Sequence, residues 1–146
     1  AKSNISLADK KANEEVTKKL FDMTQELAYL VYEVDETIKA AEAAKAKSSS
    51  AAKTVTPFIN ELNKLKETLV VTTGDNYVGA GEPQLREDLA ELYSKVASTF
   101  YKPSAAEMDN LSALSDRMQN AKATLKKTKE KHNKKLNEVL DNNKLE

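Results

Sequence analysis

Apolar residues recur every three or four positions along most of this chain, which is the spacing of one helix face. The first run of this spacing extends from Val16 to Ala41 and predicts a helix of about 36 residues, roughly 55 Å long. Three serines in the segment 47–52 interrupt the run, because serine side chains compete for backbone hydrogen bonds, and they predict a turn. A second run extends from Val55 to Leu69, with Pro57 expected in its first turn.

The second half of the chain holds a short run and then a long one. The short run extends from Leu85 to Phe100 behind Pro83, and acidic residues in its first turns favour a helix start there. Ser104 and Glu107 form the S-x-x-E pattern of a capping box, which begins a last run that continues to near Asp141. The cluster of β-branched residues at 69–73 is too short and too isolated to build a sheet.

These patterns predict one all-α domain over residues 1–146, an antiparallel up-down-up-down bundle with long first and last helices and two shorter middle helices. Because the long helices are expected to overhang the short pair, their ends would pair with each other near the chain termini or dock on a partner. The apolar residues of this possible docking surface are Val16, Leu20, Leu136, Val139 and Leu140. Tyr29 and Tyr32 are expected to pack in the core or on its shoulder, and a surface patch with Phe21 is the alternative.

All three glycines lie in the segment 74–81, between the second and third runs. A phosphate-binding loop needs a preceding strand and free amide groups at the following helix start. Here the segment before is helical, Glu82 repels phosphate and Pro83 has no amide hydrogen. The segment is therefore interpreted as the hinge between two helices, with Tyr77 and Val78 packed on the bundle.

The composition offers few groups for catalysis. The chain has no cysteine and one histidine, His132, which falls on the apolar stripe of the last run and is predicted to be structural. Lys129 stands three positions before it, so the Glu-x-x-His pattern of di-iron bundles is absent. No catalytic, cofactor-binding or metal-ligating residue is predicted, and the isolated chain is predicted not to be an enzyme. No apolar stretch reaches the roughly 18 residues of a membrane span, which predicts no membrane insertion.

Lysines crowd the last helical run, although the 23 basic and 23 acidic residues of the chain cancel. The possible basic patch consists of Lys126, Lys127, Lys129, Lys131, Lys134 and Lys135. No arginine or aromatic residue lies among them, and these are the residues that read base edges and stack on bases. The pattern therefore disfavours nucleic-acid binding. A solvated face is favoured, with a surface for an acidic partner or for nucleic acid as alternatives.

The segment "GDNYVGAGEPQLREDLAELYSKVASTFYKPSAAEMDNLSALSDRM" (74–118) resembles the C-terminal helical region of large bacterial proteins with sortilin-like or sialidase-like (BNR) propeller repeats. These proteins are common in Bacteroidetes and are often described loosely as glycosyl hydrolases. The match covers roughly residues 60–140 and consists of helix-packing positions and one loop. The positions that fit the family frame are Gly74, Asp75, Pro83, Leu85, Leu89, Leu92, Tyr93, Val96, Pro103, Leu111 and Leu114. Glu82 departs from it, since the family more often has Tyr or Asn-Tyr before this proline.

The resemblance implies a non-catalytic accessory helical domain, excised from a larger protein and docked on its parent propeller domain or a neighbouring subunit. It also implies a periplasmic or cell-surface location, with any catalysis in the propeller, and it makes residues 3–15 a linker from the preceding domain. Two other functions are left open. One is a stand-alone helical adaptor, and the other is a nucleic-acid or acidic-partner binder that uses the lysine-rich last helix.

Overall fold

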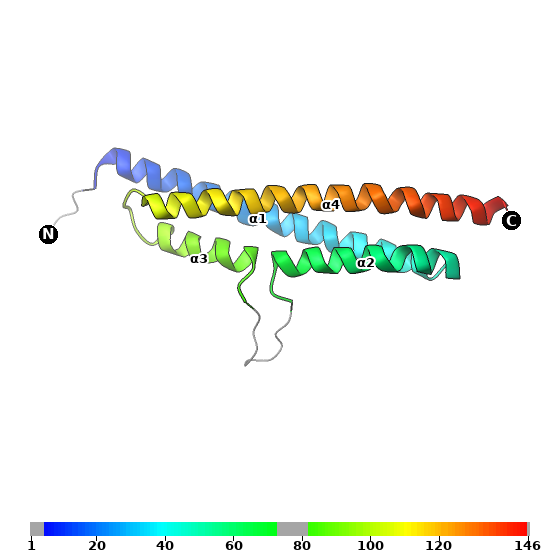
Figure 1. Ribbon diagram of the computed structural model, residues 1–146. Coiled ribbons are helices and arrows are strands. Elements are labelled where there is room, and N and C mark those ends of the chain that lie inside the picture. The colour runs from blue at the N-terminus through cyan, green and yellow to red at the C-terminus, as the bar shows by residue number, and fades with distance from the viewer. Residues whose placement is uncertain (1–4, 73–81, 146) are drawn as a thin grey trace.

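The computed structural model describes residues 5–72 and 82–145, with side chains up to residue 138. The chain folds into four helices, α1 (Leu7–Lys45), α2 (Ser49–Leu69), α3 (Leu85–Ala97) and α4 (Ala105–Leu145), and the described residues contain no strand (Figure 1). The predicted all-α bundle with long first and last helices and two shorter middle helices is therefore confirmed.

Side-chain caps mark where the helices begin, and at α3 the Gln84 amide donates to Glu87 Oε1. The Oγ of Ser6 accepts a hydrogen bond from the amide of Asp9 at the start of α1. Ser48 caps α2 in the same way, so the predicted serine turn is confirmed. At α4 the predicted capping box is present: the Ser104 amide donates to Glu107 Oε1 at 2.9 Å, and the Glu107 amide donates to Ser104 Oγ at 3.1 Å. Each cap satisfies amide groups that have no partner inside the helix.

Pro57 does not lie in the first turn of α2, and that prediction was wrong. The cap at Ser48 starts the helix at Ser49, about two turns before the proline. Pro57 therefore lies inside the helix, with its side chain exposed, and the carbonyl of Lys53 lacks the amide donor that a helix normally supplies. The serine cap and the buried residues that follow it outweigh the preference of proline for a helix start.

Contacts between the helices show the direction in which each one runs. Glu26 pairs with Lys122 and Glu33 pairs with Lys129, so residue numbers rise together and α1 is parallel to α4. Asp35 of α1 pairs with Lys66 of α2, whereas Asn13, near the start of α1, bonds to the Val96 carbonyl in α3. The colours in Figure 1 show that both middle helices run back toward the start of α1, antiparallel to it.

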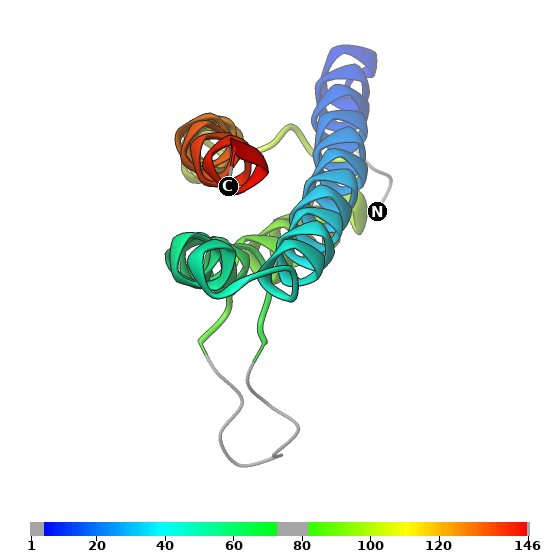
Figure 2. The same cartoon turned by 90° about the vertical axis from the view of Figure 1, so that its right-hand side faces the viewer.

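The middle helices α2 and α3 consequently lie end to end and form one column (Figures 1 and 2). The order of directions is up-down-down-up, which differs from the alternation predicted from the sequence. Helix lengths explain the difference: α2 and α3 have 21 and 13 residues, and together they cover α1 and α4, which have 39 and 41. Stacking the short helices lets both long helices bury their apolar stripes along most of their length.

The two ends of the chain lie at opposite ends of the bundle (Figure 1). The predicted contact between the first and last helices near the chain termini is therefore wrong. Val16 and Leu20 are buried in the core, and Leu136 is partly buried against it. Val139 and Leu140 belong to α4, but their side chains lie outside the described residues. Because Val16 and Leu20 are buried, they offer no surface for docking.

One apolar core extends through the bundle, built from the stripes that the sequence pattern predicts. Its fully buried members come from all four helices and include Leu27, Leu62, Leu89 and Leu114. The glycine segment connects α2 to α3, as predicted, but Tyr77, Val78 and the three glycines lie outside the described residues. The buried core therefore determines the positions of the surface side chains.

Candidate functional site

His132 lies in the core between α2 and α4 and is only 3% exposed. Its ring stacks on Phe58, with 4.8 Å between the ring centroids. The Nε2 atom lies 2.8 Å from Glu61 Oε2, and because an ionised carboxylate only accepts, Nε2 carries the hydrogen. Within the described residues, Nδ1 has no hydrogen-bond partner. The histidine thus joins α2 to α4.

The hydrogen bond from His132 holds the pKa of the Glu61 carboxyl below its ordinary value. Partial burial of Glu61 opposes this effect, and the charges of His132 and Lys131 add to it. Lys131 Nζ lies 3.4 Å from the second oxygen, Glu61 Oε1. Glu61 therefore pairs with two adjacent residues of α4, Lys131 and His132. These contacts fix how α2 and α4 are aligned along their length.

Acidification is expected to weaken this link between α2 and α4. Because the pKa of Glu61 is lower in the folded chain than in the unfolded one, the link stabilises the fold above the ordinary glutamate pKa of about 4.3 and is lost as the pH falls through the folded value. Urea unfolding of the Glu61→Gln variant between about pH 3 and pH 6 should show a weaker dependence of stability on pH than the wild type. The exposed Glu67 provides the control: if Glu67→Gln weakens the dependence equally, the link does not act as described.

The described residues offer no metal site. Among them, no group of three or more His, Cys, Asp or Glu side chains is placed to hold a metal ion. Across the same residues, none of the helices combines the length and apolar character that crossing a membrane requires.

The lysines of the predicted basic patch have different surroundings. Lys129 pairs with Glu33 at 3.2 Å and Lys131 pairs with Glu61, so both link α4 to a neighbouring helix. The other four, Lys126, Lys127, Lys134 and Lys135, are exposed. The six lysines therefore do not form one uniform surface, because part of their charge is matched by glutamates of α1 and α2.

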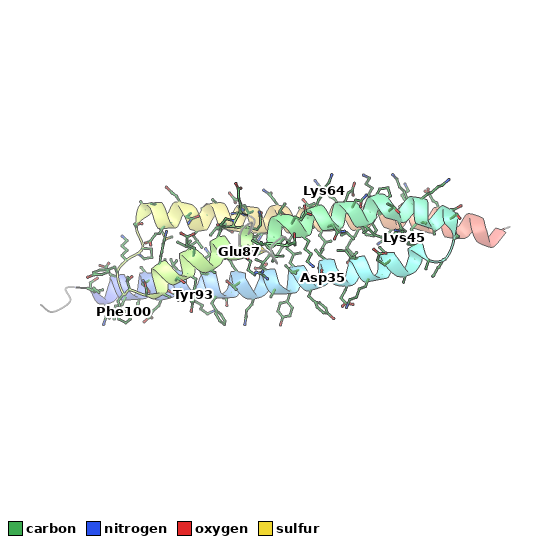
Figure 3. All side chains as sticks on the ribbon, turned by 90° about the horizontal axis from the view of Figure 1, so that it is seen from below. Asp35, Lys45, Lys64, Glu87, Tyr93 and Phe100 are labelled. Carbon is green, nitrogen blue, oxygen red and sulfur yellow. The ribbon has the colours of Figure 1, made fainter. Side chains whose placement is uncertain are left out.

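Exposed apolar side chains gather at the end of the bundle where α1 begins. We call Leu7, Phe100 and Tyr101 the end patch; their exposures are 71%, 64% and 65%. Phe100 and Tyr101 lie in the connection between α3 and α4, and Figure 3 shows Phe100 at this end of the molecule. Lys10, one turn after Leu7, places its Nζ 5.8 Å from the centre of the Phe100 ring. The start of α1 and the α3–α4 connection thus share one surface.

Asn13 of α1 anchors the α3–α4 connection, which carries Phe100 and Tyr101 of the end patch. This side chain is 5% exposed, and its Nδ2 donates to the carbonyls of Val96 and Tyr101, both at 2.9 Å. It therefore satisfies a carbonyl at the end of α3 and fixes the backbone of the connection at the same time. The capping box at Ser104 fixes the other end of the connection. The aromatic side chains are exposed, although the backbone that carries them is anchored at both ends.

The end patch was missed in the sequence analysis. The third apolar run was predicted to continue to Phe100, but α3 ends at Ala97 and Phe100 is exposed, so that part of the prediction was wrong. The prediction for Tyr29 and Tyr32 was wrong, since both are largely exposed on the outer side of α1. They lie on the side opposite the buried stripe of that helix, and Phe21 is half-exposed on the same side.

No protein family, curated protein sequence or solved structure gives a match to this chain.

Proposed function

We propose that this chain is a non-catalytic helical docking domain and that the end patch is its contact surface. The observation that carries the proposal is the combination of large exposed aromatic side chains with an anchored backbone. Aromatic residues dominate the binding energy of protein interfaces, and a rigid backbone lowers the entropy lost on binding. Phe100 and Tyr101 meet both conditions, because Asn13 and the capping box of α4 hold the connection that presents them.

The partner in this proposal is a neighbouring domain of the same polypeptide or a neighbouring subunit. The resemblance to the helical region of propeller-repeat proteins supports a propeller domain that precedes this chain, at the periplasm or cell surface. Helix α1 enters the bundle beside the end patch, so a preceding domain would meet this surface first (Figure 1). Any catalysis or ligand recognition would then belong to the partner, and the helical domain would set its position.

The test uses the polypeptide that the gene encodes upstream of Ala1, produced separately from the helical domain. We expect the two parts to bind in trans in an isothermal titration. The double variant Phe100→Ser/Tyr101→Ser is expected to weaken binding by at least about 30-fold, because each aromatic anchor of an interface contributes roughly 1–2 kcal/mol or more.

The matched control is Tyr29→Ser/Tyr32→Ser, which removes two equally exposed aromatic rings from the outer side of α1. This control should bind like the wild type. If the two parts do not bind, or if both double variants bind with unchanged affinity, the proposal of a preceding partner domain is wrong.

A further inference from the structure

A groove of about 650 Å³ lies beside the break in the middle column, between that column and α4. Leu69 at the end of α2 and Leu85 at the start of α3 line it together with Ala121 of α4, and all three are buried. Helix α2 ends at Leu69 and α3 begins at Leu85. The volume falls within the range of about 300–1,000 Å³ that is usual for ligand sites.

The walls of the groove carry neutral polar side chains that both donate and accept hydrogen bonds. They are Thr68, Gln84, Asn120, Thr124 and Thr128. Thr68 donates to the carbonyl of Leu65 and Gln84 donates to that of Glu82. In the part of the chain with described side chains, no side-chain hydrogen bond involves Asn120, Thr124 or Thr128. The α4 wall therefore offers free hydrogen-bonding groups on two successive turns.

The charges of the groove are not balanced. Arg117 is held by Asp88 at 2.7 Å, and Lys131 shares Glu61 with His132. Lys64 on α2 and Lys127 on α4 also line the groove, and neither makes an ion pair with any described residue. Figure 3 shows Lys64 on the edge of α2 that faces away from α1 and from the labelled Asp35.

The groove between α1 and α4 provides an internal comparison. Its lining has equal numbers of basic and acidic side chains: Lys122, Lys126 and Lys129 with Glu26, Glu33 and Glu130. Two of these lysines bridge the groove to glutamates of α1. The lysines of α4 that face α1 are thus matched by carboxylates, whereas in the groove at the α2–α3 break the one lining carboxylate, Glu61, is taken by Lys131 and His132.

We propose that the groove at the α2–α3 break binds an acidic segment of a partner protein, with its carboxylates beside Lys64 and Lys127. The segment is extended, because the free groups of Asn120, Thr124 and Thr128 then pair with peptide N–H and C=O groups. Among the residues that the structure describes, no aromatic side chain lines the groove, so these residues offer no stacking surface of the kind that single-stranded nucleic acids use. This groove is separate from the end patch, and either proposal can fail while the other holds.

The experiment measures the fluorescence anisotropy of labelled decaglutamate as the protein is added at low salt. We expect saturable binding, and we expect Lys64→Glu/Lys127→Glu to weaken it by about 30-fold, since like charges then face the probe. The matched control, Lys19→Glu/Lys134→Glu, makes the same change of net charge at exposed lysines outside the groove and should weaken binding by no more than about 3-fold. Circular dichroism checks that all variants are folded.

Three results would overturn the proposal. The first is no saturable binding by the wild type. The second is an equal loss of binding in both double variants, which would show a general charge effect and no site. The third is displacement of the peptide by oligothymidylate at an equal or lower concentration of negative charge, which would assign the groove to nucleic acid.

Discussion

Replacing Leu62 or Leu89 by alanine is expected to lower the free energy of unfolding by about 2–5 kcal/mol. Both side chains are fully buried, one in α2 and the other in α3, and alanine at either position would leave a cavity that the packed core fills only partly. The two helices barely touch each other, but both pack on α1 and α4. A loss of packing in either helix should therefore lower the stability of the whole bundle.

Urea unfolding followed by circular dichroism measures this effect. Each variant should show one cooperative transition at a lower midpoint, with an unchanged dependence on urea concentration. Leu7→Ala is the control, because this leucine is exposed in α1 and its loss should cost less than about 0.5 kcal/mol. If Leu89→Ala produced two separate transitions, α3 would be an independent unit and the single core would be contradicted.

Asn13→Ala is expected to lower the free energy of unfolding by about 1–3 kcal/mol, because it removes both hydrogen bonds that the buried Asn13 Nδ2 donates and leaves the Tyr101 carbonyl without that donor. The change should also loosen the α3–α4 connection, which carries the end patch. Hydrogen exchange at the amides of Phe100 and Tyr101 should become faster than in the wild type.

Asn60→Ala is the matched control, since Asn60 is exposed within α2. Its effect on unfolding should stay within about 0.5 kcal/mol, with no change of exchange near Tyr101. If Asn13→Ala lowered stability but left exchange at Phe100 and Tyr101 unchanged, Asn13 would be a core residue without a role in presenting the end patch.

The helices and most of their starts were predictable because they depend on local patterns. The serine turn and the capping box of Ser104 and Glu107 each need only a few neighbouring residues. Pro57 shows the limit of such rules, because a strong cap upstream decided where α2 begins. Asn13 continues the stripe of Val16 and Leu20 at a spacing of three, so a buried polar residue could have been predicted there.

The direction of the helices was not predictable from the same patterns. An amphipathic stripe shows which side of a helix is buried, but it does not show which helix covers it. The pairing of His132 with Glu61 and the uncovered Lys64 and Lys127 depend on the register between α2 and α4, which exists only after the short helices have stacked. The combined length of the two short helices is close to that of one long helix. This match was the signal in the sequence that could have predicted the stacking of α2 and α3.

Both proposed surfaces depend on the up-down-down-up order, so the distance between the ends of α1 and α4 tests the central claim most directly. The chain has no cysteine, so Lys11→Cys and Lys135→Cys, both at exposed positions, would carry two spin labels for a pulsed dipolar measurement. The pairing of Glu33 with Lys129 places Lys135 far along α4 from the start of α1. We predict a separation of about 40 Å along the bundle, from the rise of 1.5 Å per helical residue. An alternating up-down-up-down bundle brings the same positions within about 20 Å of each other, and that result would contradict the arrangement described.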